Sequence, residues 1–235
     1  STPLYSSAAS DVYKRQRGNV MIFKAVLLLF VTIFTVPELR GQQRGDYFKP
    51  LPQRTIQTDR EALRLMRNGK LDLVLPGSMR DNDVDMWIHV VQGGIRDPLA
   101  LDLGGQISFG VNDTVGYYIF TDRGDERIER VILGGYGDDG IYDYFGSEKE
   151  LYQFVKERDP KVIAVNMSLA LPIANGLSHT AYLRMTKALG KKYTNRIISA
   201  EDVITNFRVR RVQQEITVFA NTCEMQRQIM EAALY

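Results

Sequence analysis

The sequence predicts an α/β fold in which helices flank a mixed sheet, followed by a long C-terminal helix. Three patterns support this prediction. Short apolar runs of strand-like composition recur between residues 84 and 166. Helix-starting signals alternate with these runs, the clearest being the capping boxes at 58–61 and 147–150. In residues 210–234, apolar side chains recur at the spacing of an amphipathic helix.

The composition excludes several classes of protein. The chain has 235 residues, of which 44% are hydrophobic, so it can bury a core and is not a disordered chain. A single Cys rules out a disulfide scaffold or a Cys-rich zinc module, and two His rule out a multi-histidine metal site. The formal net charge is +2, but the first 41 residues hold five basic and two acidic side chains. The remainder has 25 basic and 26 acidic residues, so no electrostatic case for nucleic-acid binding survives.

The first 41 residues are interpreted as lying outside the folded domain. Residues 1–20 show no helical or strand period and precede a Met, so they are interpreted as a non-native leader, with a genuine disordered leader as the alternative. Residues 21–41 resemble a signal peptide, because Lys24 precedes the apolar run 25–36. That run is shorter than the roughly 20 residues a membrane span needs. We therefore expect an exported protein without a stable membrane span in its mature form, a buried core helix being the alternative.

The mature region opens with a polar segment and then turns into regular elements. Residues 42–56 are rich in Gln, Arg and Pro and predict an extended arm, which precedes an α/β domain at 57–207. The first capping box opens a helix. Residues 70–82 fit both a strand and a helix, and the helix is favoured. The nearly continuous apolar run 84–91 predicts a strand buried on both faces.

The remaining elements follow from turn residues and periodicity. Further strands are predicted at 99–103, 116–121, 127–133 and 161–166. Further helices are predicted at 147–157, at 178–189 with Gly190 as its end, and from a cap at 199–202. The last helix has an apolar side that consists of Val212, Ile216, Phe219, Cys223, Met230 and Ala233. This side needs a partner, so we expect that a further domain follows and that residues 208–235 are the helix leading into it.

No residue pattern in the chain assigns a catalytic, cofactor-binding or metal-binding site. The glycine-rich segment 134–140 lacks the spacing of a dinucleotide or P-loop motif and predicts a mobile turn. Asp138 and Asp139 are adjacent, and neighbouring side chains in extended chain point apart, so they make a poor cation site. His89 is expected to be a satisfied histidine in the core or at a sheet edge. His179 is expected in the first turn of a helix, and Cys223 is expected to act as a small hydrophobe.

Other polar groups have simple interpretations. No GxSxG motif is present to supply a serine nucleophile, and nothing specific supports a Cys–His pair. The glycosylation sequons at Asn112 and Asn166 matter only in a eukaryotic secretory pathway. Most of the clustered carboxylates are expected to be solvated turn residues, namely Asp81, Asp83, Asp85, Asp122, Asp125 and Glu126.

Three segments, in order, resemble the N-terminal domain of creatinase/prolidase-type metallopeptidases, the Xaa-Pro aminopeptidase relatives with a pita-bread catalytic domain. Residues 73–82, LVLPGSMRDN, run into 84–88 and resemble the opening helix and first strand of that domain. Residues 162–168, VIAVNMS, with 175–180, NGLSHT, resemble a later strand, loop and helix. Residues 210–216, RRVQQEI, resemble the helix that leads into the catalytic domain.

The resemblance implies a two-domain enzyme with a ribonuclease-H-like N-terminal domain. The catalytic domain would hold two divalent metal ions through two Asp, one His and two Glu, all of them beyond Tyr235. The present chain would then be an inactive lid and oligomerisation domain of a homodimer that admits short peptides. The alternatives are a non-catalytic exported binding or scaffold module, whose last helix pairs with a partner, and the N-terminal domain of a creatinase-type amidinohydrolase.

Overall fold

The computed structural model describes residues 56–106, 114–137 and 140–234, and it confirms the predicted α/β class. The predicted leader, signal peptide and extended arm lie outside these residues, apart from Ile56. The helices are α2 (Ile56–Gly69), the π-helix η1 (Lys70–Val74), α3 (Leu75–Arg80), the 3₁₀ helix η2 (Glu148–Glu150), α4 (Leu151–Arg158), the 3₁₀ helix η3 (Pro172–Ala174), α5 (His179–Thr194), α6 (Glu201–Val209) and α7 (Gln213–Leu234). The strands are β1 (Met86–Gln92), β2 (Gly105–Gln106), β3 (Val115–Thr121), β4 (Glu129–Leu133), β5 (Tyr136–Gly137), β6 (Tyr144–Gly146), β7 (Ile163–Val165) and β8 (Ile197–Ser199).

Six strands form a mixed sheet in the order β6-β4-β3-β1-β7-β8. β3 pairs antiparallel with both β1 and β4, whereas the pairs β1–β7, β7–β8 and β4–β6 are parallel. β3 is therefore the one strand of this sheet that runs against the other five. β2 and β5 form a separate two-stranded antiparallel pair.

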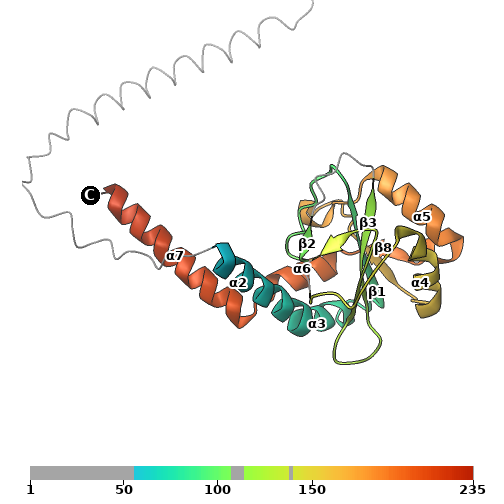
Figure 1. Ribbon diagram of the computed structural model, residues 1–235, viewed down its shortest axis with the longest axis horizontal. Coiled ribbons are helices and arrows are strands. Elements are labelled where there is room, and N and C mark those ends of the chain that lie inside the picture. The colour runs from blue at the N-terminus through green and yellow to red at the C-terminus, as the bar shows by residue number, and fades with distance from the viewer. Residues whose placement is uncertain (1–55, 107–113, 138–139, 235) are drawn as a thin grey trace, which may run out of the picture. The chain divides into compact units, whose positions relative to one another are not determined.

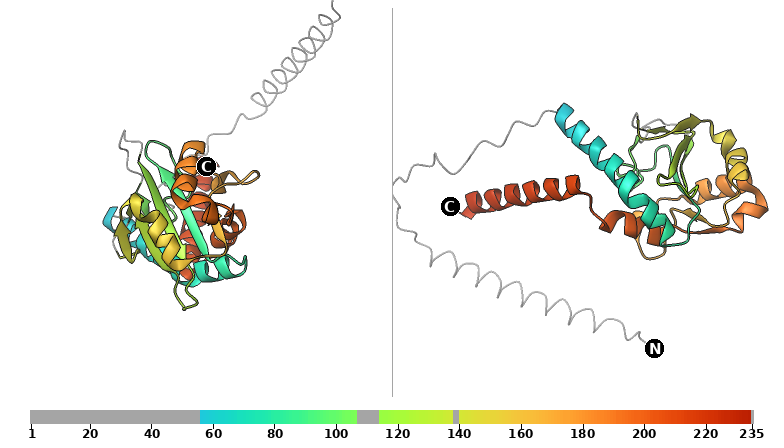
Figure 2. Two further views of the ribbon diagram at one scale, coloured as in Figure 1. Left: turned by 90° about the vertical axis from the view of Figure 1, so that its right-hand side faces the viewer. Right: turned by 90° about the horizontal axis from the view of Figure 1, so that it is seen from below.

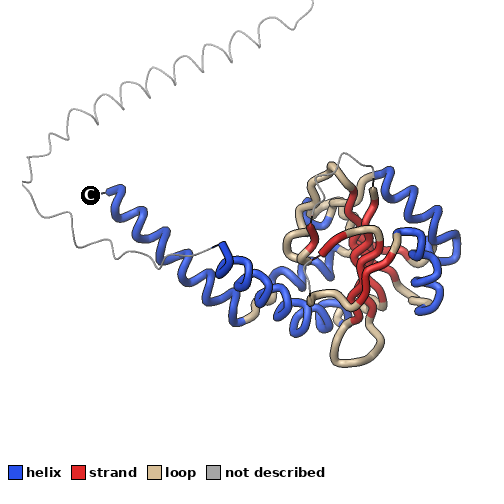
Figure 3. Tube along the Cα trace, viewed as in Figure 1, coloured by secondary structure: helices blue, strands red, loops and turns tan. Residues whose placement is uncertain are grey.

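Helices cover both faces of the sheet (Figures 1 and 3). Successive side chains of a strand point to opposite faces, so a strand that is apolar throughout needs cover on both. Trp87 of β1 packs with residues of α3 and α6 on one face. Met86, Ile88 and Val90 point to the opposite face and pack with residues of α4 and α5. Both faces of β1 are thus apolar, which explains its nearly continuous hydrophobic run.

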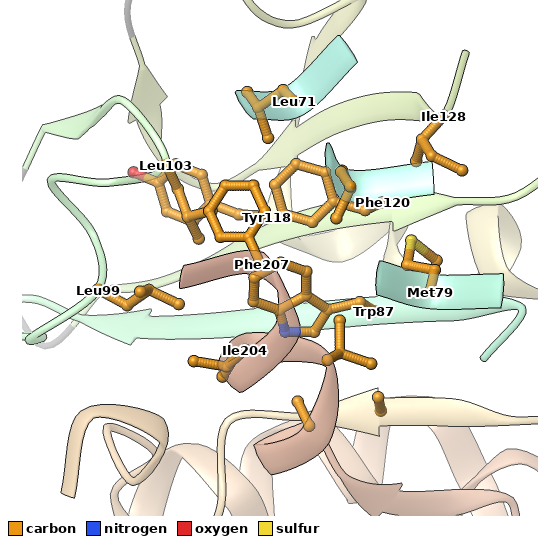
Figure 4. Packing of buried hydrophobic residues seen from close by; sticks show 14 of the residues in the cluster. Leu71, Met79, Trp87, Leu99, Leu103, Tyr118, Phe120, Ile128, Ile204 and Phe207 are labelled. Atoms are coloured by element: carbon orange, nitrogen blue, oxygen red, sulfur yellow. The ribbon is translucent and has the colours of Figure 1, made fainter. Parts of the chain in front are cut away.

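An aromatic cluster forms the centre of the face that α3 and α6 cover (Figure 4). The ring of Trp87 lies 5.0 Å from that of Phe120 and 6.1 Å from that of Phe207, between centroids. All three side chains are almost fully buried. Burial of such a side chain contributes about 2–3 kcal/mol, so this cluster joins β1, β3 and α6 firmly.

The structure confirms most predicted elements and corrects one. Residues 70–80 are helical, as favoured over a strand, and the box at Ser147 forms both of its reciprocal hydrogen bonds. The predicted strand at 99–103 is wrong: Leu103 N–H donates to the Leu99 carbonyl and Gly105 N–H to that of Ala100. These residues make successive turns that bury Leu99 and Leu103 while Leu101 is exposed, whereas a strand would place all three on one face.

Of two predicted helix ends, the one at Gly190 is wrong and the one before Asp159 is confirmed. Helical dihedral angles break at Gly190, which has φ 70°, but the chain resumes its helix to the end of α5. The helix over 147–157 ends as predicted, because Asp159 adopts a left-handed conformation with φ 42°.

The long C-terminal helix forms, but it begins at Gln213 instead of Arg210, so Val212, predicted on its apolar side, precedes it and is buried in the core. The rest of the predicted apolar side is not covered. α7 has no buried residue, and Ile216, Phe219 and Met230 are each at least half exposed. Cys223 is also exposed, so the prediction that it packs as a small hydrophobe is not met by the described residues. Among those residues, no helix is both long enough and apolar enough to cross a bilayer.

Candidate functional site

A buried polar cluster lies where the parallel strands β1 and β7 end. His89 of β1 contacts Asp97 through Nε2 and Oδ1, 2.8 Å apart, and neither residue is more than 4% exposed. Asn166 follows β7 directly and bonds to both backbone groups of Val90: it accepts from the N–H at 2.9 Å and donates to the carbonyl at 2.8 Å. Asn166 thereby extends the pairing of β1 and β7 by one step through its side chain.

Asp97 is the hub of this cluster. Its Oδ1 accepts a hydrogen bond from the Leu99 N–H at 2.9 Å, and its Oδ2 lies 3.5 Å from Asn166 Nδ2. Burial alone raises the pKa of the Asp97 carboxyl, but His89 and the amides of Leu99 and Ala100 outweigh that effect and lower the pKa below its ordinary value. The carboxylate is therefore held as an anion that ties the loop after β1 to the sheet.

His89 lies in the core, as one of the two expected placements, but the expectation that it is satisfied is met only at Nε2. Its Nδ1 and the Nε1 of Trp87 are buried and have no hydrogen-bond partner among the described residues. The two rings meet edge to face, with centroids 5.8 Å apart. His89 is fully buried and does not line the neighbouring cavity, whereas its partner Asp97 does.

A cavity of about 400 Å³ opens beside the cluster. Its lining includes Asp97, Gly93, Gly134, Gly135 and Tyr136. The predicted mobile turn at 134–140 is therefore a defined structure up to Gly137. It turns at Gly134, which has φ 71°, and then forms β5. Asp138 and Asp139 lie outside the described residues.

Two glycines next to this wall, Gly105 and Gly137 of the β2–β5 pair, are required by packing. A Cβ at Gly137 would lie 2.5 Å from Cδ1 of Ile132, and one at Gly105 would lie 2.8 Å from the hydroxyl of Tyr118. The Tyr118 hydroxyl donates to the Tyr136 carbonyl at 2.6 Å. The turn thus lies directly on the side chains of β3 and β4.

The other polar residues singled out in the sequence do not converge. His179 is exposed at the first position of α5, as predicted, and Ser178 caps that helix by accepting from the Ala181 N–H. Asp85 accepts from the N–H groups of Lys161 and Val162. Asp122 binds Arg80 through both carboxylate oxygens. Of the two sequons, Asn112 lies outside the described residues, and Asn166 is fully buried with its side chain engaged.

A second cluster joins the α/β domain to α7. Lys70, the first residue of η1, donates to the carbonyl of Arg210 at 2.5 Å and forms an ion pair with Glu215 at 3.3 Å. Its ammonium also lies 5.0 Å from the ring centre of Phe207. Burial lowers the pKa of Lys70, against the opposing effect of Glu215. Lysine is rarely buried unless it is paired, and Lys70 is only 7% exposed. Its burial therefore depends on the partners that this junction provides.

Arg210 forms the other side of this junction. Its guanidinium Nη2 lies 2.5 Å from Oδ2 of Asp81, at the end of α3. It passes over Gly77, where a Cβ would be 2.9 Å from Nη1. The structure thus brings together the LPGSMRDN and RRVQQEI segments, which are far apart in the sequence. Sequence reasoning placed Lys70 in a helix but gave it no role, because charged helix residues are usually solvated.

In comparisons with protein-family models, curated proteins and solved structures, the chain matched none. Within the part of the chain that the structure describes, no three His, Cys, Asp or Glu side chains are grouped to hold a metal ion.

Proposed function

We propose that this chain is the N-terminal domain of an exported creatinase/prolidase-type metallopeptidase, where it acts as a lid and oligomerisation domain for a catalytic domain that follows α7. The observation that supports this most is the contact between the first and third of the resembling segments. Arg210 bonds to Asp81 across the space that Gly77 leaves. Two sequence motifs that resemble one family therefore share a structural purpose, which is to anchor the helix leading out of the domain.

The second resembling segment has a comparable role. Asn166 and Gly176 both lie against Asp97, so the VIAVNMS and NGLSHT motifs hold the loop that follows β1. In addition, the strand order β4-β3-β1-β7-β8, with β3 alone antiparallel, is compatible with a ribonuclease-H-like sheet. These features support the family assignment without involving any residue in catalysis.

The exposed side of α7 supports the lid role. Ile216, Phe219 and Met230 form a stripe with Cys223 at helical spacing, and solvent reaches each of them. Exposed apolar stripes of this kind mark surfaces that another protein segment covers. In the proposed enzyme, the covering segment is the catalytic domain, whose two divalent metal ions would activate a water molecule for attack on the peptide bond. A rigid lid would limit the length of peptide that enters.

The test is to express the gene beyond the codon for Tyr235. The proposal predicts that the extended product hydrolyses short Xaa-Pro peptides, that chelation of divalent metal abolishes this activity, and that residues 42–235 alone show none. Hydrolysis by residues 42–235 would contradict the assignment of the chemistry to a following domain. A stop codon, or a continuation without the two Asp, one His and two Glu, would contradict the enzyme.

A non-catalytic scaffold module is the second candidate, and the same stripe favours it. Such a module would use α7 to bind a separate partner. An extended product that hydrolyses a guanidino substrate such as creatine, and not Xaa-Pro peptides, would instead identify an amidinohydrolase of the same fold.

A further inference from the structure

We propose that Lys70, Glu215 and Arg210 form a latch that fixes the direction in which α7 leaves the α/β domain. The proposal concerns the junction itself and holds whether or not a catalytic domain follows. Only residues 210–212 connect α6 to α7, and Arg210 is extended with φ −76° and ψ 129°. A connector of this length and conformation would ordinarily act as a hinge. Each of its three residues is instead held by separate contacts.

Arg210 is held at two points. Its carbonyl accepts from Lys70, and its guanidinium pairs with Asp81 on α3. Rotation about the backbone at this residue would break one contact or the other, because the two partners come from different helices. A carbonyl bonded to a buried ammonium is costly to release, since the lysine would lose its partner while still out of water.

Val212 is held by the core. It is only 4% exposed and belongs to the same cluster as Trp87. A Cβ built on Gly69, the last residue of α2, would lie 3.6 and 3.7 Å from the two methyl carbons of Val212. α7 therefore begins against the end of α2, and the two helices diverge from there (Figure 2).

Glu215 joins these contacts to α7. One carboxylate oxygen accepts from the Val212 N–H at 3.0 Å and lies 3.3 Å from Lys70 Nζ. The other oxygen accepts from Arg211 at 3.2 Å. Glu215 thus caps the first turn of α7 and ties that turn to the domain with the same side chain. Its side chain is 14% exposed and that of Lys70 is 9% exposed, so solvent screens this ion pair only weakly.

The charged groups around Lys70 have opposing effects on its pKa. Glu215 and Asp102 favour its ammonium form, whereas Arg211 disfavours it. Asp102 is in turn paired with Arg208, 3.3 Å away on α6. The charged groups of this junction therefore come from η1, α6, α7, the connector and the loop after β1, and their geometry defines a single arrangement of the connector.

The full-length chain allows a direct test, because Cys223 is its only cysteine and is exposed on α7. A second cysteine replaces Lys187, which is exposed on α5. Spin labels at both sites report the distribution of distances between α7 and the domain. We expect one narrow distribution of distances for the parent and a broad distribution for Lys70→Met and Glu215→Gln.

Matched controls separate a released latch from other effects. Arg227→Gln removes ion pairs that lie within α7, away from the connector, and should leave the distribution narrow. Fluorescence of Trp87, the only tryptophan and fully buried, reports whether the domain stays folded. Glu215→Gln keeps the shape of the side chain, so it remains informative if Lys70→Met fails to fold. A broad distribution in the parent, unchanged distributions in both latch variants, or equal broadening in Arg227→Gln would overturn the proposal.

Discussion

The carboxylate of Asp97 occupies the space that a side chain at Gly176 would need. A Cβ built on Gly176 would lie 2.0 Å from Oδ2 of Asp97 and 3.2 Å from Nδ2 of Asn166. The glycine is required here by close approach, since no positive φ is involved. The loop before α5 can therefore reach the sheet only if position 176 carries no side chain, and this contact connects the loop after β1 to the loop after β7.

The first prediction is that Gly176→Ala destabilises the protein by about 3 kcal/mol, at the upper end of the range for overpacking. The methyl group must displace the carboxylate of Asp97. That carboxylate is buried and hydrogen-bonded, so it cannot move aside without losing its hydrogen bonds. Urea unfolding followed by Trp87 fluorescence measures the loss.

Gly69→Ala is the matched control for this substitution. Gly69 is helical, and a Cβ there would meet Val212 and Gln214 at 3.6 Å, which is ordinary contact. Because alanine is the better helix former, we expect a gain of about 0.5–1 kcal/mol. Equal effects of the two substitutions would refute the close-approach argument.

The second prediction concerns acid stability. The pKa of Asp97 is lowered in the folded state, so its charge stabilises the fold above the ordinary aspartate value of 3.8. This contribution to stability is lost as the pH falls through the lowered pKa that Asp97 has in the folded protein. Asp97→Asn removes it at every pH. We therefore expect the parent to exceed the variant in stability at neutral pH and the gap to close only below about pH 4.

Urea midpoints measured from about pH 7 down to about pH 2 test this dependence. The difference between parent and variant isolates Asp97 from other acidic groups, such as Asp122 and Glu150, whose pKa values are also lowered. A gap that stays constant over the whole range would show that the carboxylate acts through shape alone.

The fold was largely predictable because its long elements have strong local signals. β3 is buried along its length and β1 along all but its last two residues, and the box at 147–150 marks a helix start. The box predicted at 58–61 lies within α2, which already begins at Ile56. The edge strands β6 and β8 were missed, since three residues are too few to show a period and pairing with a neighbour defines them. The turns at Leu99 and Leu103 were mistaken for a strand because leucines recur at every second position, 99, 101 and 103, as on one face of a strand.

The polar clusters were harder to predict, because their partners are distant in sequence. His89 could be placed in the core from its apolar neighbours, but Asp97 lies in a loop without any period. The partners Lys70 and Glu215 are 145 positions apart by their numbers and resemble ordinary helix-surface charges. Only the packing of α2, α6 and α7 reveals that both are largely buried.

The third prediction is that Asn166→Leu costs about 2–4 kcal/mol. Leucine has a similar size but leaves both the N–H and the carbonyl of Val90 buried without their present partner. Asn175→Ala is the control, because the side-chain oxygen of Asn175 accepts an exposed hydrogen bond of 3.4 Å from the Ser168 N–H. We expect that change to stay within about 0.5 kcal/mol in thermal or urea unfolding. A small effect at Asn166 would mean that β1 and β7 do not depend on this side-chain pairing.

The last prediction compares two apolar residues at the start of α7. Val212→Ala should cost about 2 kcal/mol, because Val212 belongs to the core. Phe219→Ala should change stability by no more than about 0.5 kcal/mol, since Phe219 is 52% exposed and contacts Arg211 at the surface. In a longer product whose following domain covers the stripe, Phe219→Ala should become as costly as Val212→Ala. If Phe219→Ala stays neutral in that product, the stripe is not the surface on which the following domain packs.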